Sequence, residues 1–329
     1  MSHTGVWAGI DIGGTKTAVV LSSHPPQVLS RTEFPTLPAE GPGPAIDKIR
    51  SILREALAPH TVSTARLLGI GISCGSPLDP VAGVIQAPPN LSTWIDVPIV
   101  KILEMEFKCP VSLENDANAG ALAEHQYGAG RGTRDMIFLT MGTGLGAGII
   151  IGGRLHRGAS NYAGEIGHVR LTRTGPIGYH KAGSVEGWAS GGGLAQVAHR
   201  ALNAARQKGQ RSLLLDLPPH HAVTAKDVGL AAQQGDAVAL GIIRTCGHRL
   251  GEAMAVLVDI INPERIVIGG LALRLGNLVL DPARESLRRE ALPPAFEACT
   301  VVSAELGESI GDVAALCVAT QFAGGMQKA

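Results

Sequence analysis

Short apolar runs rich in β-branched residues alternate with amphipathic stretches along most of this chain. The short runs are typical of buried strands, whereas apolar residues at positions 45, 46, 49, 52, 53 and 57 recur with the period of a helix. The pattern predicts strands at residues 6–12, 17–21, 28–34, 67–73, 111–113, 135–141 and 149–151 and near Val301. It predicts helices at residues 45–58, 117–127, 194–207, 225–234, 237–258 and 311–321. This order favours an α/β protein with mixed sheets covered by helices.

Two glycine-rich stretches share one layout, in which a strand, a tip of glycine and polar residues, and a second strand follow one another. The first tip is Asp11-Ile-Gly-Gly-Thr-Lys16, and the second is Gly142-Thr-Gly-Leu-Gly-Ala-Gly148. Glycine lets backbone N–H groups approach an anion, so both tips are predicted to bind phosphate. In the first tip, Asp11 is suited to hold a hydrated Mg²⁺ and Lys16 adds a positive charge. Ordinary glycine turns are the alternative, but the repeat favours a duplicated fold that closes on one nucleotide from both sides.

The stretch from Leu113 to Ala119 joins a buried strand to an alanine-rich helix. Open α/β sheets bind their ligands at such strand ends, where polar side chains can face a cleft. We therefore predict Asp116 as a general base and Asn115 as a ligand of a sugar hydroxyl. A pair of helix N-cap residues is the alternative, because Asn and Asp are also favoured in that position.

Two further stretches carry polar residues of interest. Glu165 and His168 are separated by a glycine-containing step and are predicted to face hydroxyl groups together, although such a pair can also form half of a metal site. The stretch Gln86–Trp94, which contains Asn90, is rich in turn-forming residues and is predicted to be a surface loop.

Composition narrows the class of protein. A length of 329 residues exceeds what one hydrophobic core usually supports, so two lobes are expected. Lys plus Arg and Asp plus Glu both number 28, which leaves no excess of positive charge for nucleic acid or an anionic membrane. The five cysteines are scattered without a CxxC pair, as is usual in a reducing compartment. With no leader-like amino terminus and no apolar stretch of membrane-spanning length, we expect a cytoplasmic protein.

Six motifs appear in order along the chain, and together they resemble the ROK family, which comprises sugar kinases and repressors. They are Asp-Ile-Gly-Gly-Thr-Lys (11–16), Glu-Asn-Asp-Ala-Asn-Ala (114–119), Gly-Thr-Gly-Leu-Gly-Ala-Gly (142–148), Gly-Glu-Ile-Gly-His (164–168), Glu-Gly-Trp-Ala-Ser-Gly (186–191) and Ile-Val-Ile-Gly-Gly-Leu (266–271). The resemblance covers nearly the whole chain. It implies a two-lobed actin-like ATPase fold, related to ribonuclease H, with duplicated mixed sheets, helices on both faces and a cleft between the lobes. The smaller lobe is expected at residues 1–113, completed by a helix at about 311–329, and the larger lobe at residues 114–310.

The resemblance also implies roles for individual residues. Asp116 matches the family's catalytic base, and Asp11 matches the aspartate linked to Mg²⁺, which we expect to act through water. The positions on the sugar side are Asn90, Asn115, Glu165, His168 and Glu186, with Gly75 and Ser76 in a more variable substrate loop. The positions on the nucleotide side are Gly13, Gly14, Thr15, Lys16, Gly142, Thr143 and Gly144 in the two phosphate hairpins, and Gly269 and Gly270 beside the adenosine.

One stretch departs from the family pattern. Many members bind a structural zinc ion through a cysteine cluster together with the histidine that corresponds to His168. Here residues 174–184 contain no cysteine, and His168 with His180 supplies at most two of the four ligands that such a site needs. We predict that no zinc binds and that apolar contacts and Tyr179 hold this loop.

The function that the resemblance implies is phosphoryl transfer from ATP, with Mg²⁺, to a hexose hydroxyl. Glucose and its C6 hydroxyl are the first expectation, while N-acetylmannosamine, N-acetylglucosamine, allose and fructose remain open as substrates and polyphosphate remains open as donor. Repressor members carry a helix-turn-helix segment ahead of the kinase-like body, and the ten residues before Asp11 leave no room for one. A sugar sensor without catalysis is a further alternative. A homodimer is expected from the resemblance alone.

Overall fold

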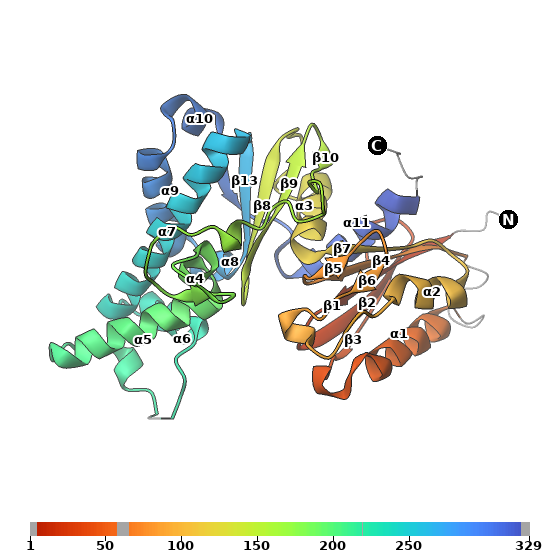
Figure 1. Cartoon of the computed structure of the whole chain (residues 1–329), viewed down its shortest axis with the longest axis horizontal. Coiled ribbons are helices and arrows are strands. Elements are labelled where there is room, and N and C mark those ends of the chain that lie inside the picture. The colour runs from red at the N-terminus through yellow and green to blue at the C-terminus, as the bar shows by residue number, and fades with distance from the viewer. Residues whose placement is uncertain (1–4, 58–65, 219, 324–329) are drawn as a thin grey trace. The chain divides into compact units, whose positions relative to one another are not determined.

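The computed structural model describes residues 5–57, 66–218 and 220–323. The chain divides into two compact units, the first made of residues 1–128 and 308–329 and the second of residues 129–307 (Figure 1). From the sequence, the boundaries between the two lobes are instead expected after residues 113 and 310. The difference concerns mainly α3 (Asp116–Tyr127), which packs on α11 (Ile310–Ala323) within the first unit. Residues 1–4, 58–65, 219 and 324–329, which the predicted lobes include, lie outside the described residues, and so does residue 58 of the predicted helix 45–58.

The first unit is built on a five-stranded mixed sheet in the order β3, β2, β1, β4, β7. The strands are β1 (Val6–Ile12), β2 (Lys16–Ser22), β3 (Ser30–Pro35), β4 (Leu67–Cys74) and β7 (Val111–Asn115). The first three strands form an antiparallel meander, while β1, β4 and β7 run parallel. The side chains of β1 and β4 are mostly buried along the whole strand, as expected where helices cover both faces of a sheet.

The last helix of the chain, α11, lies directly on β1 and β4. A Cβ atom built at Gly71 of β4 would be 2.1 Å from the carbonyl oxygen of Ala315, so glycine is what lets helix and strand approach this closely. In Figure 1 the blue α11 lies beside the strands of the red and orange sheet, although the two come from opposite ends of the chain. The remaining elements of this unit are α1 (Pro42–Ala56), α2 (Ile99–Phe107), the short hairpin β5 (Leu78–Asp79) and β6 (Val84–Ile85), and 3₁₀ turns at Pro38–Glu40 and Pro89–Leu91.

The sheet of the second unit repeats the strand arrangement of the first. Its order is β10, β9, β8, β13, β14, with β8, β9 and β10 forming an antiparallel meander and β13 and β14 running parallel to β8. The strands are β8 (Met136–Met141), β9 (Leu145–Ile151), β10 (Arg154–Leu155), β13 (Arg265–Gly270) and β14 (Thr300–Ser303). The shared order confirms that two mixed sheets of one design make up this α/β fold.

Helices cover the second sheet, and the long α7 packs along α9 (Figure 1). A Cβ atom at Gly251 of α7 would be 2.2 Å from the carbonyl oxygen of Ala283, which explains how the two backbones come so close. The helices are α4 (Val185–Ala189), α5 (Gly191–Gln207), α6 (Ala225–Gln233), α7 (Ala237–Ile261), α8 (Leu271–Leu275), α9 (Asn277–Glu290) and α10 (Pro293–Ala298). The short elements are the hairpin β11 (Ile177–Gly178) and β12 (Lys181–Ala182) and 3₁₀ turns at Ile166–His168 and Leu213–Leu215, while a further 3₁₀ turn, Gly307–Ser309, spans the boundary between the two units.

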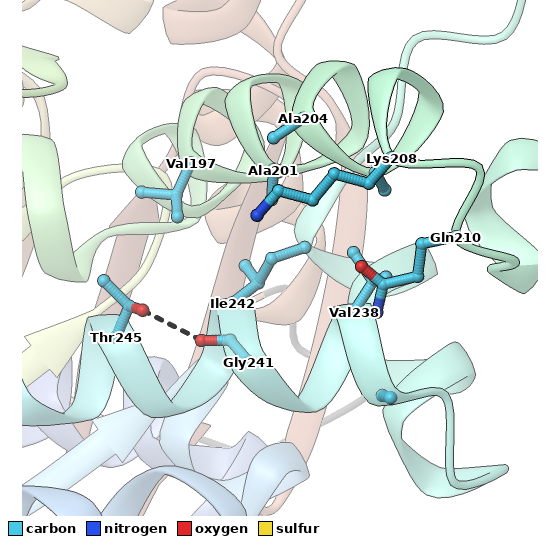
Figure 2. A pocket seen from close by; sticks show the side chains of 11 residues that line it. Val197, Ala201, Ala204, Lys208, Gln210, Val238, Gly241, Ile242 and Thr245 are labelled. Atoms are coloured by element: carbon cyan, nitrogen blue, oxygen red, sulfur yellow. Dashed lines mark hydrogen bonds between the residues drawn. The ribbon is translucent and has the colours of Figure 1, made fainter.

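A groove of about 310 Å³ lies between α5 and α7 (Figure 2). Most of the side chains that line it are small or apolar, and Lys208, Gln210 and Thr245 contribute polar groups. None of the residues singled out in the sequence lines it.

Most predicted elements are confirmed, with four main differences. Helix α5 begins at Gly191 rather than at residue 194, because the hydroxyl of Ser190 accepts a hydrogen bond from the N–H of Gly193 and caps a glycine-rich first turn. Strand β9 begins at Leu145 rather than at residue 149. The stretch Gln86–Trp94 is a loop with a 3₁₀ turn and exposes Asn90, as predicted, but it does not lie on the surface throughout, because Trp94 is fully buried in the core of the first unit. The helices α2, α4, α8, α9 and α10 are absent from the prediction.

No helix in the described parts of the chain combines the length and the apolar content needed to cross a bilayer.

Candidate active site

The candidate residues of the first unit lie at the ends of three adjacent parallel strands. Ile12 of β1 is in register with Cys74 of β4, and Cys74 is in register with Asn115 of β7. Asp11, the segment that begins at Gly75, and Asp116 therefore come together at the carboxyl ends of these strands. This is the edge at which open α/β sheets bind ligands.

The first glycine tip is a tight β-hairpin turn between β1 and β2. The N–H of Gly13 donates to the carbonyl oxygen of Lys16 over 3.0 Å, and the hydroxyl of Thr36 donates to the carbonyl oxygen of Gly13 over 2.6 Å. A Cβ atom at Gly14 would be 2.5 Å from the Cβ of Asn90, so the missing side chain makes room for the turn that carries Asn90. The structure thus places Asn90 against the hairpin, while Thr15 and Lys16 remain exposed.

Lys16 belongs to a chain of ion pairs. Its Nζ lies 2.9 Å from Oε2 of Glu33, and the same oxygen accepts a hydrogen bond from Nη2 of Arg31 over 2.6 Å. The Nε of Arg31 donates in turn to Oδ2 of Asp312 in α11 over 2.7 Å. No pattern in the sequence indicates a role for Arg31 or Asp312, because their pairing joins β3 to the far end of the chain.

Asp11 lies in an environment that favours its neutral form. Burial, together with the negative charges of Asp116 and Asp312, raises the pKa of Asp11 to about 6, against a hydrogen bond with Ser73 and the positive charge of Lys16. A divalent cation would reverse this balance by supplying positive charge to the carboxylates. The site therefore fits a hydrated Mg²⁺ held by Asp11.

Asp116 is the first residue of α3, where the partial positive charge of the helix end favours a carboxylate. Its Oδ1 accepts hydrogen bonds from the N–H of Ala117 over 2.8 Å and from Nδ2 of Asn115 over 3.1 Å. The residue reaches solvent, but the protein packed around its carboxyl group raises the pKa of Asp116 above 3.8, and these hydrogen bonds oppose that rise. The carboxylate is thus fixed in direction and more basic than an aspartate in water.

Asn115 is the N-cap of α3, so the N-cap alternative is correct for this residue. Its Oδ1 accepts hydrogen bonds from the N–H groups of Ala117 and Asn118 over 2.9 and 3.3 Å, and its Nδ2 also donates to the hydroxyl of Ser76 over 2.8 Å. One side chain therefore starts the helix, holds Asp116 and fixes Ser76. Gly75, beside Ser76, has open space where a side chain would point.

The second glycine tip, in the second unit, is backed by Glu186 and the start of α5. The N–H of Gly142 donates to the carbonyl oxygen of Gly144 over 2.9 Å, and the N–H groups of Gly191 and Gly192 donate to the carbonyl oxygens of Gly142 and Thr143. The Oε2 of Glu186 accepts a hydrogen bond from the N–H of Leu145 over 3.2 Å. A Cβ atom at Gly144 would be 2.6 Å from that oxygen, so a side chain at this position would displace the Glu186 carboxylate.

Glu165 and His168 lie beside Glu186. The segment that carries them rests on β9, since the N–H of Ala147 donates to the carbonyl oxygen of Gly164 over 3.1 Å. A Cβ atom at Gly167 would be 3.4 Å from the Cβ of Glu186. The structure therefore brings together the three sugar-side residues that the sequence assigns to this unit.

Gly269 and Gly270 end β13 next to the second glycine tip. Gly270 is in register with Met141 of β8, the residue before Gly142. Its φ of 69° is unfavourable for other residues, and a Cβ atom there would be 2.4 Å from the carbonyl oxygen of Met141.

The loop expected to replace a zinc site is held by Tyr179 and by polar contacts. The rings of Tyr179 and His168 pack edge to face with centroids 4.9 Å apart, as the sequence predicted for Tyr179. The Nε1 of Trp188 donates to the hydroxyl of Thr172 over 2.8 Å, and the side chain of Gln196 forms hydrogen bonds with the backbone of Ile177. Within the described ranges, no group of three or more His, Cys, Asp or Glu residues is arranged to hold a metal ion. The absence of zinc stays a prediction, which elemental analysis of tag-free protein tests.

The start of α5 is a feature that the sequence prediction missed. Gly191 and Gly192 bond to the second glycine tip, and Ser190 caps the helix. A serine followed by a helix-compatible stretch is a recognisable N-cap signal, but the glycines lower helix propensity and obscured it.

Comparison with known proteins identifies the family. The profile of the ROK family matches residues 7–321. The chain belongs to the ROK family. It is 33% identical over 324 residues to a glucokinase of Halalkalibacterium halodurans, a match that spans 98% of this chain and 97% of that protein.

Two other relatives show the range within the family. The crystal structure of a ROK glucokinase from Streptomyces griseus in complex with glucose and AMPPNP superposes with a TM-score of 0.79 at 33% identity, over 96% of this chain and 100% of that one. A xylose repressor of Caldicellulosiruptor bescii is 29% identical over 289 residues, which are 88% of this chain and 71% of that protein. The fold is therefore the two-unit α/β fold of the ROK kinases, as predicted, and the relatives support a sugar kinase.

Proposed function

We propose that this protein transfers the γ-phosphoryl group of ATP to a hexose, first of all to the C6 hydroxyl of glucose. The observation that carries the proposal is the state of Asp116: its carboxylate is held by the Asn115 amide and the Ala117 N–H, and its pKa is raised. A general base needs a fixed direction and a pKa closer to neutrality than that of free aspartate. The glucokinases among the relatives support this reading.

In the proposed step the sugar hydroxyl oxygen forms a bond to the γ-phosphorus, and the bond from that phosphorus to the β,γ-bridging oxygen breaks. The hydroxyl proton passes to Asp116, and ADP leaves. Most of the acceleration comes from holding the hydroxyl in line with the phosphorus, and Asp116 contributes by accepting the proton as the new bond forms.

The nucleotide is assigned to the glycine tips and to Gly269 and Gly270. The backbone N–H groups of residues 13–16 and 142–144 would approach phosphate oxygens, because the glycines at 13, 14, 142 and 144 have no side chain to keep an anion away. Asp11 would hold Mg²⁺ through water, and Lys16 would exchange Glu33 for a phosphate oxygen. When bound, Mg²⁺ neutralises charge on the phosphates.

The sugar is assigned to polar residues from both units. In the first unit these are Asn90, Ser76 and Asn115, with Gly75 leaving space for a hydroxyl or a substituent. In the second unit they are Glu165, His168 and Glu186. Carboxylates and imidazole accept hydrogen bonds from sugar hydroxyls, and such contacts discriminate strongly against sugars that lack the matching group.

A coupled kinase assay tests the proposal. Purified protein is supplied with glucose, N-acetylmannosamine, N-acetylglucosamine, allose or fructose, and with ATP or polyphosphate as donor. We expect ATP consumption that depends on sugar and is fastest with glucose. Asp116→Asn should lower kcat by about 10²- to 10⁴-fold while sugar affinity, measured by calorimetry, is retained. A variant that keeps more than about a tenth of kcat would exclude Asp116 as the base.

The same assay separates the alternatives. Fastest turnover with another sugar corrects the substrate while keeping the reaction. Sugar binding without turnover under any donor would identify a sensor and overturn the proposed reaction. The homodimer expected from the family is tested separately by analytical ultracentrifugation.

A further inference from the structure

The hairpin formed by β11 and β12 has an unusual turn. Its two central residues, Tyr179 and His180, have φ angles of 41° and 64°. Two-residue turns of this kind usually contain Asn-Gly, because residues with larger side chains rarely adopt positive φ. Both side chains are also exposed, so burial in a core does not account for their presence. Strain of this kind is often retained where it serves a site.

The hairpin contacts His168 in two ways. The Tyr179 ring packs edge to face on the His168 ring with centroids 4.9 Å apart, and Nζ of Lys181 donates to the carbonyl oxygen of His168 over 2.7 Å. Tyr179 thus restrains the imidazole of His168, and Lys181 restrains its backbone carbonyl group.

The hairpin is also fixed to the element that carries Glu186. A Cβ atom at Gly178 would be 2.8 Å from the Cβ of Glu186, and one at Gly187 would be 2.3 Å from the carbonyl oxygen of Pro176. On the other side, Gln196 of α5 accepts from the N–H of Ile177 over 2.9 Å and donates to its carbonyl oxygen over 2.8 Å. The hairpin is therefore anchored on α5 and packed against the start of α4.

We propose that Tyr179 is a positioning residue that orients His168 for the sugar, and that the strained turn exists to present its ring. The hairpin packs directly against His168 and against Glu186, so it can fix the positions of both side chains. This inference rests on the proposed function, since it assigns the sugar contact to His168. It adds a residue on which sugar selectivity depends although that residue need not touch the sugar.

Four substitutions separate the ring from the turn. Tyr179→Ala removes the ring and keeps a residue that is strained at positive φ, Tyr179→Gly removes the ring and relieves the strain, and Tyr179→Phe keeps the ring. His180→Gly relieves strain at the neighbouring position and keeps the Tyr179 ring, but it also removes the His180 ring, whose centroid lies 5.5 Å from that of the Tyr179 ring. For each variant, KM for glucose, KM for ATP and kcat are measured, together with hydrogen exchange of the backbone amides at residues 164–169.

Loss of the ring should raise KM for glucose by about three- to tenfold, the range that one aromatic contact represents. We expect this rise in both Tyr179→Ala and Tyr179→Gly, with KM for ATP unchanged and with faster exchange at residues 164–169. Tyr179→Phe and His180→Gly should retain the KM for glucose. Equal KM values in Tyr179→Ala and the unmodified protein, or recovery in Tyr179→Gly alone, would overturn the proposal.

The exchange measurement keeps the inference separate from the proposed function. If the unmodified protein phosphorylates no sugar, the kinase proposal fails and exchange still reports whether Tyr179 orders His168. If sugar is phosphorylated but exchange at residues 164–169 is the same in Tyr179→Ala and Tyr179→Phe, the positioning role fails and the kinase proposal stands.

Discussion

Gly311 and Asp11 approach so closely that a Cβ atom built at Gly311 would lie 2.3 Å from Oδ2 of Asp11. We predict that Gly311→Ala displaces this carboxylate and lowers kcat by about 10- to 100-fold, because misplacing a group in the site by an ångström has effects of that size. Alanine is the better helix former, so the free energy of unfolding should change by less than about 1 kcal/mol. Kinetics and urea unfolding of the same variant measure the two effects.

Gly241→Ala is the matched control. Gly241 lies inside α7, and a Cβ atom added there would have no neighbouring atom within 4 Å, so this substitution should stabilise the protein by about 0.5–1 kcal/mol and leave kcat unchanged. Full kcat in Gly311→Ala would contradict a role for the Asp11 position in the reaction.

At saturating Mg²⁺ and ATP the cation would keep Asp11 ionised, so the acid limb of the kcat profile should report Asp116. Its pKa is raised above 3.8, and a base works only when ionised, so kcat should fall as pH falls through a value higher than that of free aspartate. Asn115→Asp places a second negative charge beside Asp116, which raises the pKa further and moves the acid limb to higher pH. Asn115→Ser keeps an N-cap hydroxyl without the charge but loses the amide hydrogen bond that lowers the pKa of Asp116, so it should move the limb to higher pH by less than Asn115→Asp does. An unmoved limb in Asn115→Asp would argue that another group titrates.

The pair of Arg31 and Asp312 should stabilise the first unit. The Asp312 side chain is 11% exposed, so Arg31→Gln leaves a largely buried carboxylate without its charged partner. We expect a loss of about 1–3 kcal/mol in the free energy of unfolding. The double variant Arg31→Gln with Asp312→Asn should recover part of this loss, and a double-mutant cycle measured by urea unfolding gives the coupling. Strict additivity would show that the pair contributes nothing.

Asp227 should make stability depend on pH. Although burial works against it, hydrogen bonds from Thr224 and His221 lower the pKa of Asp227 to about 2. A carboxyl whose folded pKa is lowered stabilises the protein above its unfolded value of 3.8, and the contribution disappears as pH falls toward 2. Asp227→Asn should therefore cost about 1 kcal/mol at pH 7, as loss of a capping interaction does. Urea unfolding gives the difference in free energy of unfolding between the variant and the unmodified protein. This difference should disappear between pH 3.8 and about 2, and a difference that persists at pH 2 would contradict the assignment.

Local chemistry made much of this site predictable. The residues typical of a strand end at Leu113 and those typical of a helix begin at Ala117. The junction at Asn115 and Asp116 therefore follows from residues that are neighbours in sequence. The two glycine tips are predictable for the same reason, because each is a turn between its own flanking strands.

The features that could not be predicted from the sequence depend on contacts between segments that are far apart along the chain. The pairing of Arg31 with Asp312 and the approach of Gly311 to Asp11 exist only once α11 lies on β1. Trp94 lies in a segment of turn-forming residues, and only the surrounding core decides that it is buried. The same holds for Glu186, whose bond to Leu145 requires α4 to lie over the second glycine tip.

The packing of α11 on β1 and β4 has a consequence for biosynthesis. A ribosome delivers β1 long before α11, so one face of the first sheet stays uncovered until residues 129–307 have been synthesised. The unit at residues 129–307 is continuous in sequence and is under no such delay. The half of the molecule made second is therefore free to finish folding first.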